Sequence, residues 1–392
     1  MKKINFYIAV ILIAAFSMAD LSTFAQGTWT QKANPPTAIG NAVSFAISNK
    51  GYISTGTYAT GKELWEYDQL NDTWSQLADF PGLRRTDAVA FTIGNNGYVG
   101  TGWYGSTYYH DFWEYNPSTN TWMQKANFGG GSKTYAASGF SINGIGYVVG
   151  GGTNELWQYD TTNDIWSQKA FFPPGGRYYG VAFAIGQKGY YGTGFDTTSV
   201  NRNDFWEFDP SLNQWNQQAS VPGGLRSQAV GWSIGNWGYI GTGVIGGSSG
   251  TYDFFRYDPI SNSWLQKDSV GGGVRWNGSG FVINNKGYIG IGNYDDLWEY
   301  APDTVTGINE INTSNFLFDI YPNPLTSSSI LQLNIQLKNA EVVIYDVLGK
   351  EMMRKKMDGN RMEIEKGSLA SGVYFVRVRS EEKQCVEKMV VE

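Results

Sequence analysis

Cysteine and histidine are nearly missing from this chain of 392 residues, since Cys385 and His110 are the single copies of each. One cysteine excludes an internal disulfide, so packing has to stabilise the fold. One histidine excludes a metal site built on several histidines, and we do not expect a histidine-based triad either. We therefore expect no metal and no cofactor, and we interpret His110 as a loop residue.

The chain also lacks an excess of positive charge and long apolar runs. It has 29 Lys and Arg against 35 Asp and Glu, a net charge of −6, which argues against nucleic-acid binding. The apolar run Phe6–Ala19 follows Lys2 and Lys3 and precedes the small-x-small site at 23–25, which is typical of a signal peptide over residues 1–25. That run is too short to span a bilayer, and no other stretch is comparably apolar. We expect export by the Sec pathway and no transmembrane segment.

Glycine and aromatic residues are abundant, with 50 Gly, 15 Trp, 25 Tyr and 21 Phe, and they recur periodically. Each repeat has a β-rich run, a Gly-Tyr pair that opens a second run, an aromatic-acidic segment, a turn, and Trp-x-Gln. The Gly-Tyr pairs lie 43 to 49 residues apart and begin at Gly51, Gly97, Gly146, Gly189, Gly238 and Gly287. This period predicts a propeller or a solenoid with four short strands per repeat.

The Trp-x-Gln segments show how the two ends of the repeat array meet. They begin at Trp29, Trp74, Trp122, Trp166, Trp215 and Trp264. The first copy precedes the first Gly-Tyr pair, and the last repeat, which ends near Tyr300, has no copy of its own. We therefore expect the N-terminal strand around Trp29 to complete the sixth repeat and close a ring without a free edge.

The segment from about Thr28 to Tyr300 resembles a kelch-type six-bladed β-propeller of the galactose oxidase superfamily. The run from Tyr147 to Gly152, the Tyr-Asp-Pro segments and the trailing tryptophans carry the resemblance, although Thr-Gly or Ile-Gly replaces the double glycine in five of six repeats. The resemblance implies an all-β propeller over residues 26–301. The copper site of galactose oxidase needs two histidines and a cysteine joined to a tyrosine, so a copper oxidase is excluded. Whether the chain is an enzyme is left uncertain, and a binding role is favoured.

The composition changes after Tyr300, where residues 302–317 are expected to form a linker. Residues 331–337, 342–345 and 373–378 are predicted strands separated by turns, which favours a small β-sandwich over residues 318–392. This end closely resembles the type A C-terminal sorting domain of type IX secretion in Bacteroidetes-type bacteria. The motif residues are Tyr321, Pro322, Asn323, Pro324, Gly349 and Gly372. The resemblance implies the type IX machinery as a partner, transport across the outer membrane, and a location at the cell surface or outside the cell.

Candidate ligand-binding residues lie on the face of the expected propeller where the loops vary in length. At the start of the innermost strand, the repeats align Ile39, Arg85, Thr134, Arg177, Arg226 and Arg275. Guanidinium groups around the channel mouth would suit a carboxylate or an acidic sugar, but arginine at this position also suits a structural role toward loop carbonyls. The residues two positions further on share the same side of the strand and are mostly polar: Asn41, Asp87, Ala136, Tyr179, Gln228 and Asn277.

Aromatic residues outside the repeat register are candidates for stacking on sugar rings. They are Trp103, Tyr104, Tyr108, Tyr109 and Trp276. The prediction is an exported binding module for a carbohydrate or another extracellular ligand. Two alternatives stay open: a metal-free, epimerase-like or mutarotase-like enzyme on an acidic sugar at the channel mouth, and a structural spacer or matrix protein.

Overall fold

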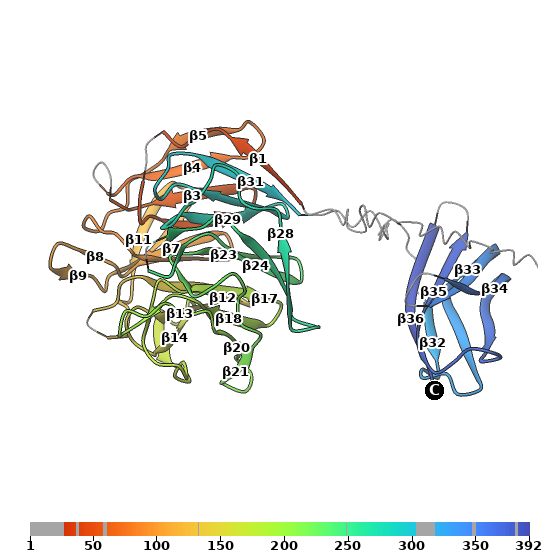
Figure 1. The fold of residues 1–392 in the computed structure, drawn as a ribbon. Coiled ribbons are helices and arrows are strands. Elements are labelled where there is room, and N and C mark those ends of the chain that lie inside the picture. The colour runs from red at the N-terminus through yellow and green to blue at the C-terminus, as the bar shows by residue number, and fades with distance from the viewer. Residues whose placement is uncertain are drawn as a thin grey trace, which may run out of the picture. The chain divides into compact units, whose positions relative to one another are not determined.

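The computed structural model describes residues 27–36, 39–57, 61–131, 133–247, 249–302, 318–346, 350–380 and 383–392. The expected signal peptide at 1–25, nearly all of the expected linker and Gly349 lie outside these ranges. The chain divides into two compact units, Met1–Thr304 and Val305–Glu392. The described residues form strands, turns and loops (Figure 1). Within them, no helix has the length and apolar character that a membrane span needs.

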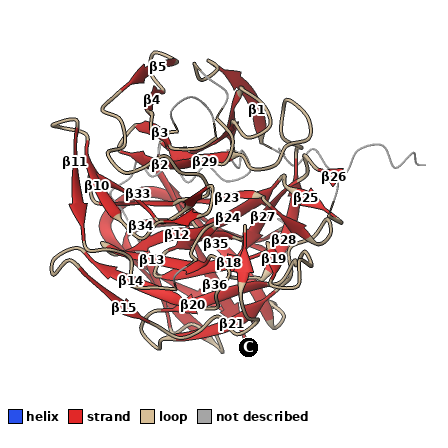
Figure 2. Ribbon diagram, turned by 90° about the vertical axis from the view of Figure 1, so that its left-hand side faces the viewer, coloured by secondary structure: helices blue, strands red, loops and turns tan. Residues whose placement is uncertain are grey.

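The described residues of the first unit form six antiparallel sheets of four strands each, besides the shorter strands described below. Each sheet has an inner strand, which lines the central channel. The inner strands are β2 (Val43–Ile47), β6 (Val89–Ile93), β12 (Ala137–Ile142), β17 (Val181–Ile185), β23 (Val230–Ile234) and β29 (Ser279–Ile283). The second strands are β3 (Lys50–Ser54), β7 (Asn96–Gly100), β13 (Ile145–Gly150), β18 (Lys188–Gly192), β24 (Trp237–Gly241) and β30 (Lys286–Gly290). Figure 2 shows the sheets arranged around a common centre.

The outer half of each sheet is formed by the aromatic-acidic strand and by a strand that carries Trp-x-Gln. The third strands are β4 (Leu64–Asp68), β10 (Phe112–Asn116), β14 (Leu156–Asp160), β20 (Phe205–Asp209), β27 (Phe254–Asp258) and β31 (Leu297–Ala301). The fourth strands are β5 (Thr73–Gln76), β11 (Thr121–Lys125), β15 (Ile165–Gln168), β21 (Gln214–Gln218), β28 (Ser263–Lys267) and, in the last sheet, β1 (Thr28–Lys32).

The glycine of each Gly-Tyr pair is required by contact with the neighbouring sheet. A Cβ atom on Gly97 would lie 2.2 Å from the ring of Phe45, and one on Gly51 would lie 2.2 Å from the ring of Phe281. The same relation holds for Gly146 with Phe91, Gly189 with Phe140, Gly238 with Phe183 and Gly287 with Trp232. Each aromatic ring of an inner strand therefore packs on the glycine of the next sheet, and the contact of Phe281 with Gly51 joins the last sheet to the first.

The tryptophans of the fourth strands link the sheets at the periphery. The indole N–H of Trp74 donates to the carbonyl of Ala33 at 2.8 Å, and that of Trp122 donates to the carbonyl of Ala78 at 2.9 Å. Trp29 completes the series, because it donates to the carbonyl of Asp268 at 3.0 Å while β1 pairs with β31 along its full length. The Trp-x-Gln repeat thus has a structural cause, and the N-terminal strand occupies the place that the sequence predicts for it.

Short two-residue strands lie on one face of this ring, in the loops that vary in length and at the start of inner strands. They are β8 (Trp103–Tyr104), β9 (Thr107–Tyr108), β16 (Arg177–Tyr178), β19 (Phe195–Asp196), β22 (Arg226–Ser227), β25 (Val244–Ile245) and β26 (Ser249–Gly250). β16 pairs with β19, and β22 pairs with β25, so each ties the start of an inner strand to the loop after the second strand. These two pairings keep the variable loops of the fourth and fifth sheets close to the channel.

The second unit is a sheet of five strands, and it differs from the expected strand list. They are β32 (Phe318–Tyr321), β33 (Ser328–Asp346), β34 (Glu351–Glu365), β35 (Gly372–Ser380) and β36 (Lys383–Val391). The runs at 331–337 and 342–345, predicted as separate strands, are parts of the one long strand β33. Its first part pairs with β32 and its second with β35, with irregular register between them. Such irregularities bend a strand, so one strand serves two parts of the sheet.

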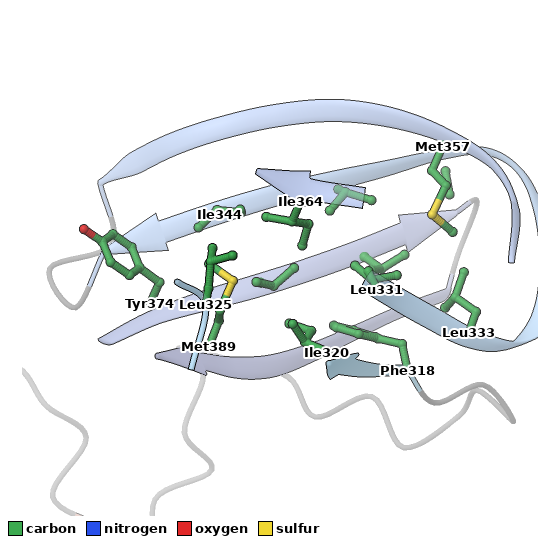
Figure 3. Packing of buried hydrophobic residues seen from close by; sticks show 14 of the residues in the cluster. Phe318, Ile320, Leu325, Leu331, Leu333, Ile344, Met357, Ile364, Tyr374 and Met389 are labelled. Atoms are coloured by element: carbon green, nitrogen blue, oxygen red, sulfur yellow. The ribbon is translucent and has the colours of Figure 1, made fainter. Parts of the chain in front are cut away.

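Bending allows this sheet to enclose a core of its own (Figure 3). Leu331 and Ile344 lie on the two parts of β33, and both are buried in one cluster with Ile364 and Met389. A parallel bridge between Leu325 and Val391 brings the start of the unit to its last strand. The core therefore forms within residues 318–392 alone.

Candidate functional site

Six residues surround the mouth of the central channel and are joined by a belt of backbone hydrogen bonds. They are the residues two positions after the aligned arginines: Asn41, Asp87, Ala136, Tyr179, Gln228 and Asn277. The amide of Asp87 donates to the carbonyl of Asn41 at 3.1 Å, the amide of Ala136 to that of Asp87 at 2.8 Å, and the series continues to Asn277. All six have φ between 52° and 57°, a left-handed conformation that is unfavourable for side chains other than glycine. The belt fixes this conformation and sets the six side chains around the opening.

These six residues line a cavity of about 150 Å³ at the mouth. Beneath it, the channel is walled by small residues of the six inner strands, among them Ala90, Ser138, Ala182 and Ser279. The side chains that define the mouth are amides, a carboxylate and a phenol, with one alanine. Such a rim can exchange several hydrogen bonds with a polar ligand that enters from the loop face.

The aligned arginines are not available at this rim, which corrects the expectation that their guanidinium groups are free to bind a ligand. Arg85, Arg177, Arg226 and Arg275 have exposed fractions of 0 or 1%. Each forms an ion pair with an aspartate of its own sheet: Asp111, Asp204, Asp253 and Asp296, respectively, at 2.8, 2.8, 2.7 and 2.9 Å.

Backbone carbonyls take further donors of the same guanidinium groups. Arg226 also donates to the carbonyls of Thr242 at 3.2 Å and Pro222 at 2.9 Å, and Arg275 donates to the carbonyl of Gly271 at 3.0 Å. The carbonyls of Pro222 and Gly271 belong to the loops that lead into the next inner strand. The arginines therefore fasten the loops of the face, which is the structural role that the sequence left open.

The ion pair with Arg85 also sets the titration of Asp111. Burial favours the neutral acid and raises its pKa, but the hydrogen bond and charge of Arg85 outweigh burial, so the pKa of Asp111 is below its ordinary value. This carboxyl stays ionised at neutral pH and neutralises the guanidinium.

A row of aromatic side chains lies beside the mouth, which we call the aromatic row: Trp103, Tyr108, Tyr135, Tyr178, Phe195 and Tyr179. Trp103 contacts Tyr135 with ring centroids 5.6 Å apart, and Tyr135 contacts Tyr178 at 4.9 Å. The row continues to Phe195, which lies 5.4 Å from Tyr178 and 5.6 Å from Tyr179. It crosses the loops of three consecutive sheets and is absent from the other three among the described residues. Burial and the neighbouring Tyr178 raise the pKa of Tyr135 to about 12, so this hydroxyl keeps its proton at neutral pH.

Asp87 connects the aromatic row to the mouth. Its carboxylate accepts hydrogen bonds from the indole of Trp103 at 2.9 Å, the amide of Asn41 at 2.6 Å and the hydroxyl of Thr86 at 2.9 Å. Burial, followed by the charge of Asp87, raises the pKa of Tyr179. The carboxylate is thus held between the row and the rim by neutral donors.

The other aromatic residues predicted from the sequence are placed differently. Tyr104 is 45% exposed, with the guanidinium of Arg84 lying 4.6 Å from its ring centroid. Tyr109 covers the buried Arg85 at 4.4 Å. Trp276 lies against Gly250, in the loops of the last two sheets. Trp103 is therefore joined to the mouth, whereas Trp276 is not part of the row.

Sequence reasoning missed Tyr135, Tyr178 and Phe195. The position directly after the aligned arginines reads Gly40, Thr86, Tyr135, Tyr178, Ser227 and Trp276. Aromatic residues at that position break the repeat, so an extension of the register by one position would have found two of the three. Phe195 lies in a loop without a register and gave no such signal.

A larger hollow of about 530 Å³ lies on the loops of the fourth sheet, with Pro173, Trp206 and Leu225 on its walls. Its charged groups already have partners, because Asp204 pairs with Arg177 and Asp196 pairs with Arg202. Among the described residues, no group of three or more His, Cys, Asp and Glu is placed to hold a metal ion. The mouth and the aromatic row are therefore the better candidate site.

In the second unit, the sorting-motif residues hold the last strand. The side chain of Asn323 donates to the carbonyl of Lys388 at 3.0 Å and accepts from the amide of Val390 at 2.8 Å. Next to Pro324, Leu325 donates its amide to the carbonyl of Val390 at 2.7 Å. Tyr321 is 77% exposed, and Gly372 begins β35, which pairs with the last strand. The motif therefore connects the start of this unit to the C-terminal strand.

The fold of the first unit is that of a β-propeller, and a solved structure titled "Structure of YjhT" supports this. The two share 19% sequence identity with a TM-score of 0.59, over 68% of this chain and 95% of that chain. At this identity the likeness concerns the fold alone. No curated protein matches the chain.

The second unit is a sorting domain. Residues 319–392 match the family described as "Secretion system C-terminal sorting domain". This match confirms the type IX sorting domain predicted from the motifs and supports export to the cell surface or the extracellular space.

Proposed function

We propose that this protein is an exported carbohydrate-binding module, which binds its ligand at the aromatic row and the channel mouth. The architecture in this proposal is a six-bladed, kelch-like β-propeller at 26–301, closed by the N-terminal strand, with a linker at 302–317 and a small β-sandwich at 318–392. A signal peptide at 1–25 directs the Sec step, and the sorting domain directs passage across the outer membrane.

The observation that carries the proposal is the aromatic row next to a polar rim. Aromatic faces bury the apolar faces of sugar rings and have few rotatable bonds to immobilise, while amides and carboxylates accept and donate hydrogen bonds to hydroxyls. Asp87 links the aromatic row to the rim, because its carboxylate accepts hydrogen bonds from Trp103 in the row and from Asn41 in the rim. This combination is expected of a carbohydrate site.

An enzyme that acts on an acidic sugar is less well supported. Such an enzyme needs a cation that faces its anionic substrate, and the four aligned arginines are buried in ion pairs. Among the described residues, the lining of the mouth includes no lysine or arginine. The proposal therefore concerns a ligand without net negative charge.

The experiment is binding of the exported chain to an array of neutral, acidic and amino glycans, together with Trp103→Ala and Tyr178→Ala. We expect each variant to lose about tenfold in affinity, since an aromatic contact contributes about 0.5–1.5 kcal/mol beyond its buried area. Tyr252→Ala is the matched control, because Tyr252 is 50% exposed in a loop of the same unit and outside the row.

All variants must show the melting transition of the native protein. If the folded native protein binds no glycan, the binding proposal is wrong and the role of an inert spacer gains support. If binding is the same in the native protein and in both row variants, the site lies elsewhere.

A further inference from the structure

Asp87 is the one residue that breaks the charge pattern of the mouth. At the same register position the other five sheets have Asn41, Ala136, Tyr179, Gln228 and Asn277, none of which is ionised at neutral pH. The repeats supply no structural reason for a carboxylate here, because the other five sheets form the same belt position without one.

The charge of Asp87 is not neutralised by a cation of the protein. Asp87 is 8% exposed, and its hydrogen-bond donors on Asn41, Thr86, Trp103 and Tyr179 are all neutral. Among the described residues, no lysine or arginine forms an ion pair with it, whereas Asp111, Asp204, Asp253 and Asp296 each have an arginine. A carboxylate that is largely removed from water and lacks a counter-ion attracts a cation strongly.

A second side chain that lines the mouth has a hydrogen-bond acceptor without a partner. The side-chain oxygen Oδ1 of Asn277 is buried and accepts no hydrogen bond from the described residues. Asn277 and Asp87 both line the mouth. An ammonium group has three N–H donors and no acceptor, so it can satisfy a carboxylate and an amide oxygen together.

We infer that the channel mouth binds a protonated amine on a sugar residue, with Asp87 as the counter-ion and Asn277 Oδ1 as a second acceptor. This inference rests on the proposed carbohydrate-binding function and names its ligand class: a glycan that contains free amino sugar residues. The aromatic row favours a sugar over a flexible cationic chain, because the rings offer flat faces next to the mouth.

The test compares oligomers of glucosamine, N-acetylglucosamine, glucose and galacturonic acid of equal length, by calorimetry with the full exported chain at about pH 6, where the amine is protonated. We expect the glucosamine oligomer to bind at least tenfold more tightly than its acetylated or glucose counterparts, and the galacturonate oligomer to bind most weakly. The preference should decrease as salt is added, since it depends on charge.

Asp87→Asn keeps the shape and removes the charge. We expect this variant to bind the glucosamine and glucose oligomers with equal affinity. Asp79→Asn is the matched control, because Asp79 is an exposed aspartate of the same unit away from the mouth, and it should keep the preference. If Asp87→Asn does not fold, the native protein still tests the inference, because its affinity for the glucosamine oligomer can be compared with its affinity for the N-acetylglucosamine oligomer.

The outcomes separate this inference from the proposed function. Equal binding of the four oligomers by the native protein would overturn the amine inference and leave the carbohydrate site intact. A preference that survives Asp87→Asn would mean that the amine is bound elsewhere. Tighter binding of a lysine homopolymer than of the glucosamine oligomer would also overturn the inference. Failure to bind any of the four oligomers would overturn the amine inference, whereas only failure to bind every glycan of the array would refute the proposed function itself.

Discussion

Replacement of Arg226 by methionine tests whether the aligned arginines serve the fold or a ligand. The guanidinium of Arg226 is fully buried and forms two hydrogen bonds with Asp253, at 2.8 and 2.7 Å, and two with backbone carbonyls. Arg226→Met fills much of the same space but leaves the carboxylate of Asp253 without its partner. Loss of one partner from a buried pair costs about 3–5 kcal/mol.

This loss should appear as a lower melting temperature. For a unit of this size, about 1 kcal/mol shifts the midpoint by about 2 °C, so we expect Arg226→Met to melt about 6–10 °C below the native protein. The side chain of Asp253 is 19% exposed, which places the expected loss toward the lower end because water screens part of its charge. Differential scanning calorimetry on the exported chain measures the shift.

Two further variants show whether the stability loss comes from the unpaired carboxylate. Arg226→Met with Asp253→Asn removes both charges and should recover part of the stability. Arg202→Ala removes an arginine that is 47% exposed and pairs with Asp196, and this control should cost less than about 1 kcal/mol. A melting temperature for Arg226→Met within about 1 °C of the native value, together with a loss of ligand binding, would show that the arginine serves a ligand and that our reasoning is wrong.

Three other predictions follow from the contacts that join the sheets. Gly97→Ala places a methyl group 2.2 Å from the ring of Phe45 and should cost about 1–3 kcal/mol in a urea titration. A normal midpoint would mean that the neighbouring sheets are not packed as described. Deletion of residues 27–33 removes β1 and should lower the melting temperature of the ring; an unchanged transition would contradict closure by β1. Burial raises the pKa of Tyr135 to about 12, whereas an unfolded tyrosine ionises near pH 10. The folded state therefore keeps the proton longer, and stability should fall as the pH rises above about 10, with full stability retained below it. A urea midpoint that does not change between about pH 9 and 11 would refute the last prediction.

The ring could be predicted from the sequence because the same contact is made six times. The Gly-Tyr pair and the Trp-x-Gln segment recur, and the structure gives each a cause: an aromatic ring packs on the glycine, and the indole donates to a carbonyl of the preceding sheet. Position in the register was therefore enough to place Trp29 in the last sheet. The second unit has no repeat, and the joining of two predicted strands into β33 depends on irregular pairing that no local pattern reveals.

The candidate site was only partly predictable, because a residue that recurs in the repeat, such as the arginines, is a poor guide to a ligand. Four of the six sheets have an arginine at the same register position. A side chain that recurs in this way most simply has the same structural role in each sheet, and here each arginine pairs with an aspartate and donates to nearby carbonyls. A ligand is not six-fold symmetric, so the residues that bind it should break the register. Asp87 breaks it by its charge, and Tyr135 and Tyr178 break it by their aromatic rings. All three lie on the same side of the mouth, because Trp103 contacts both Asp87 and Tyr135, and Tyr135 contacts Tyr178. In this protein the departures from the repeat, rather than the repeat itself, therefore point to the ligand.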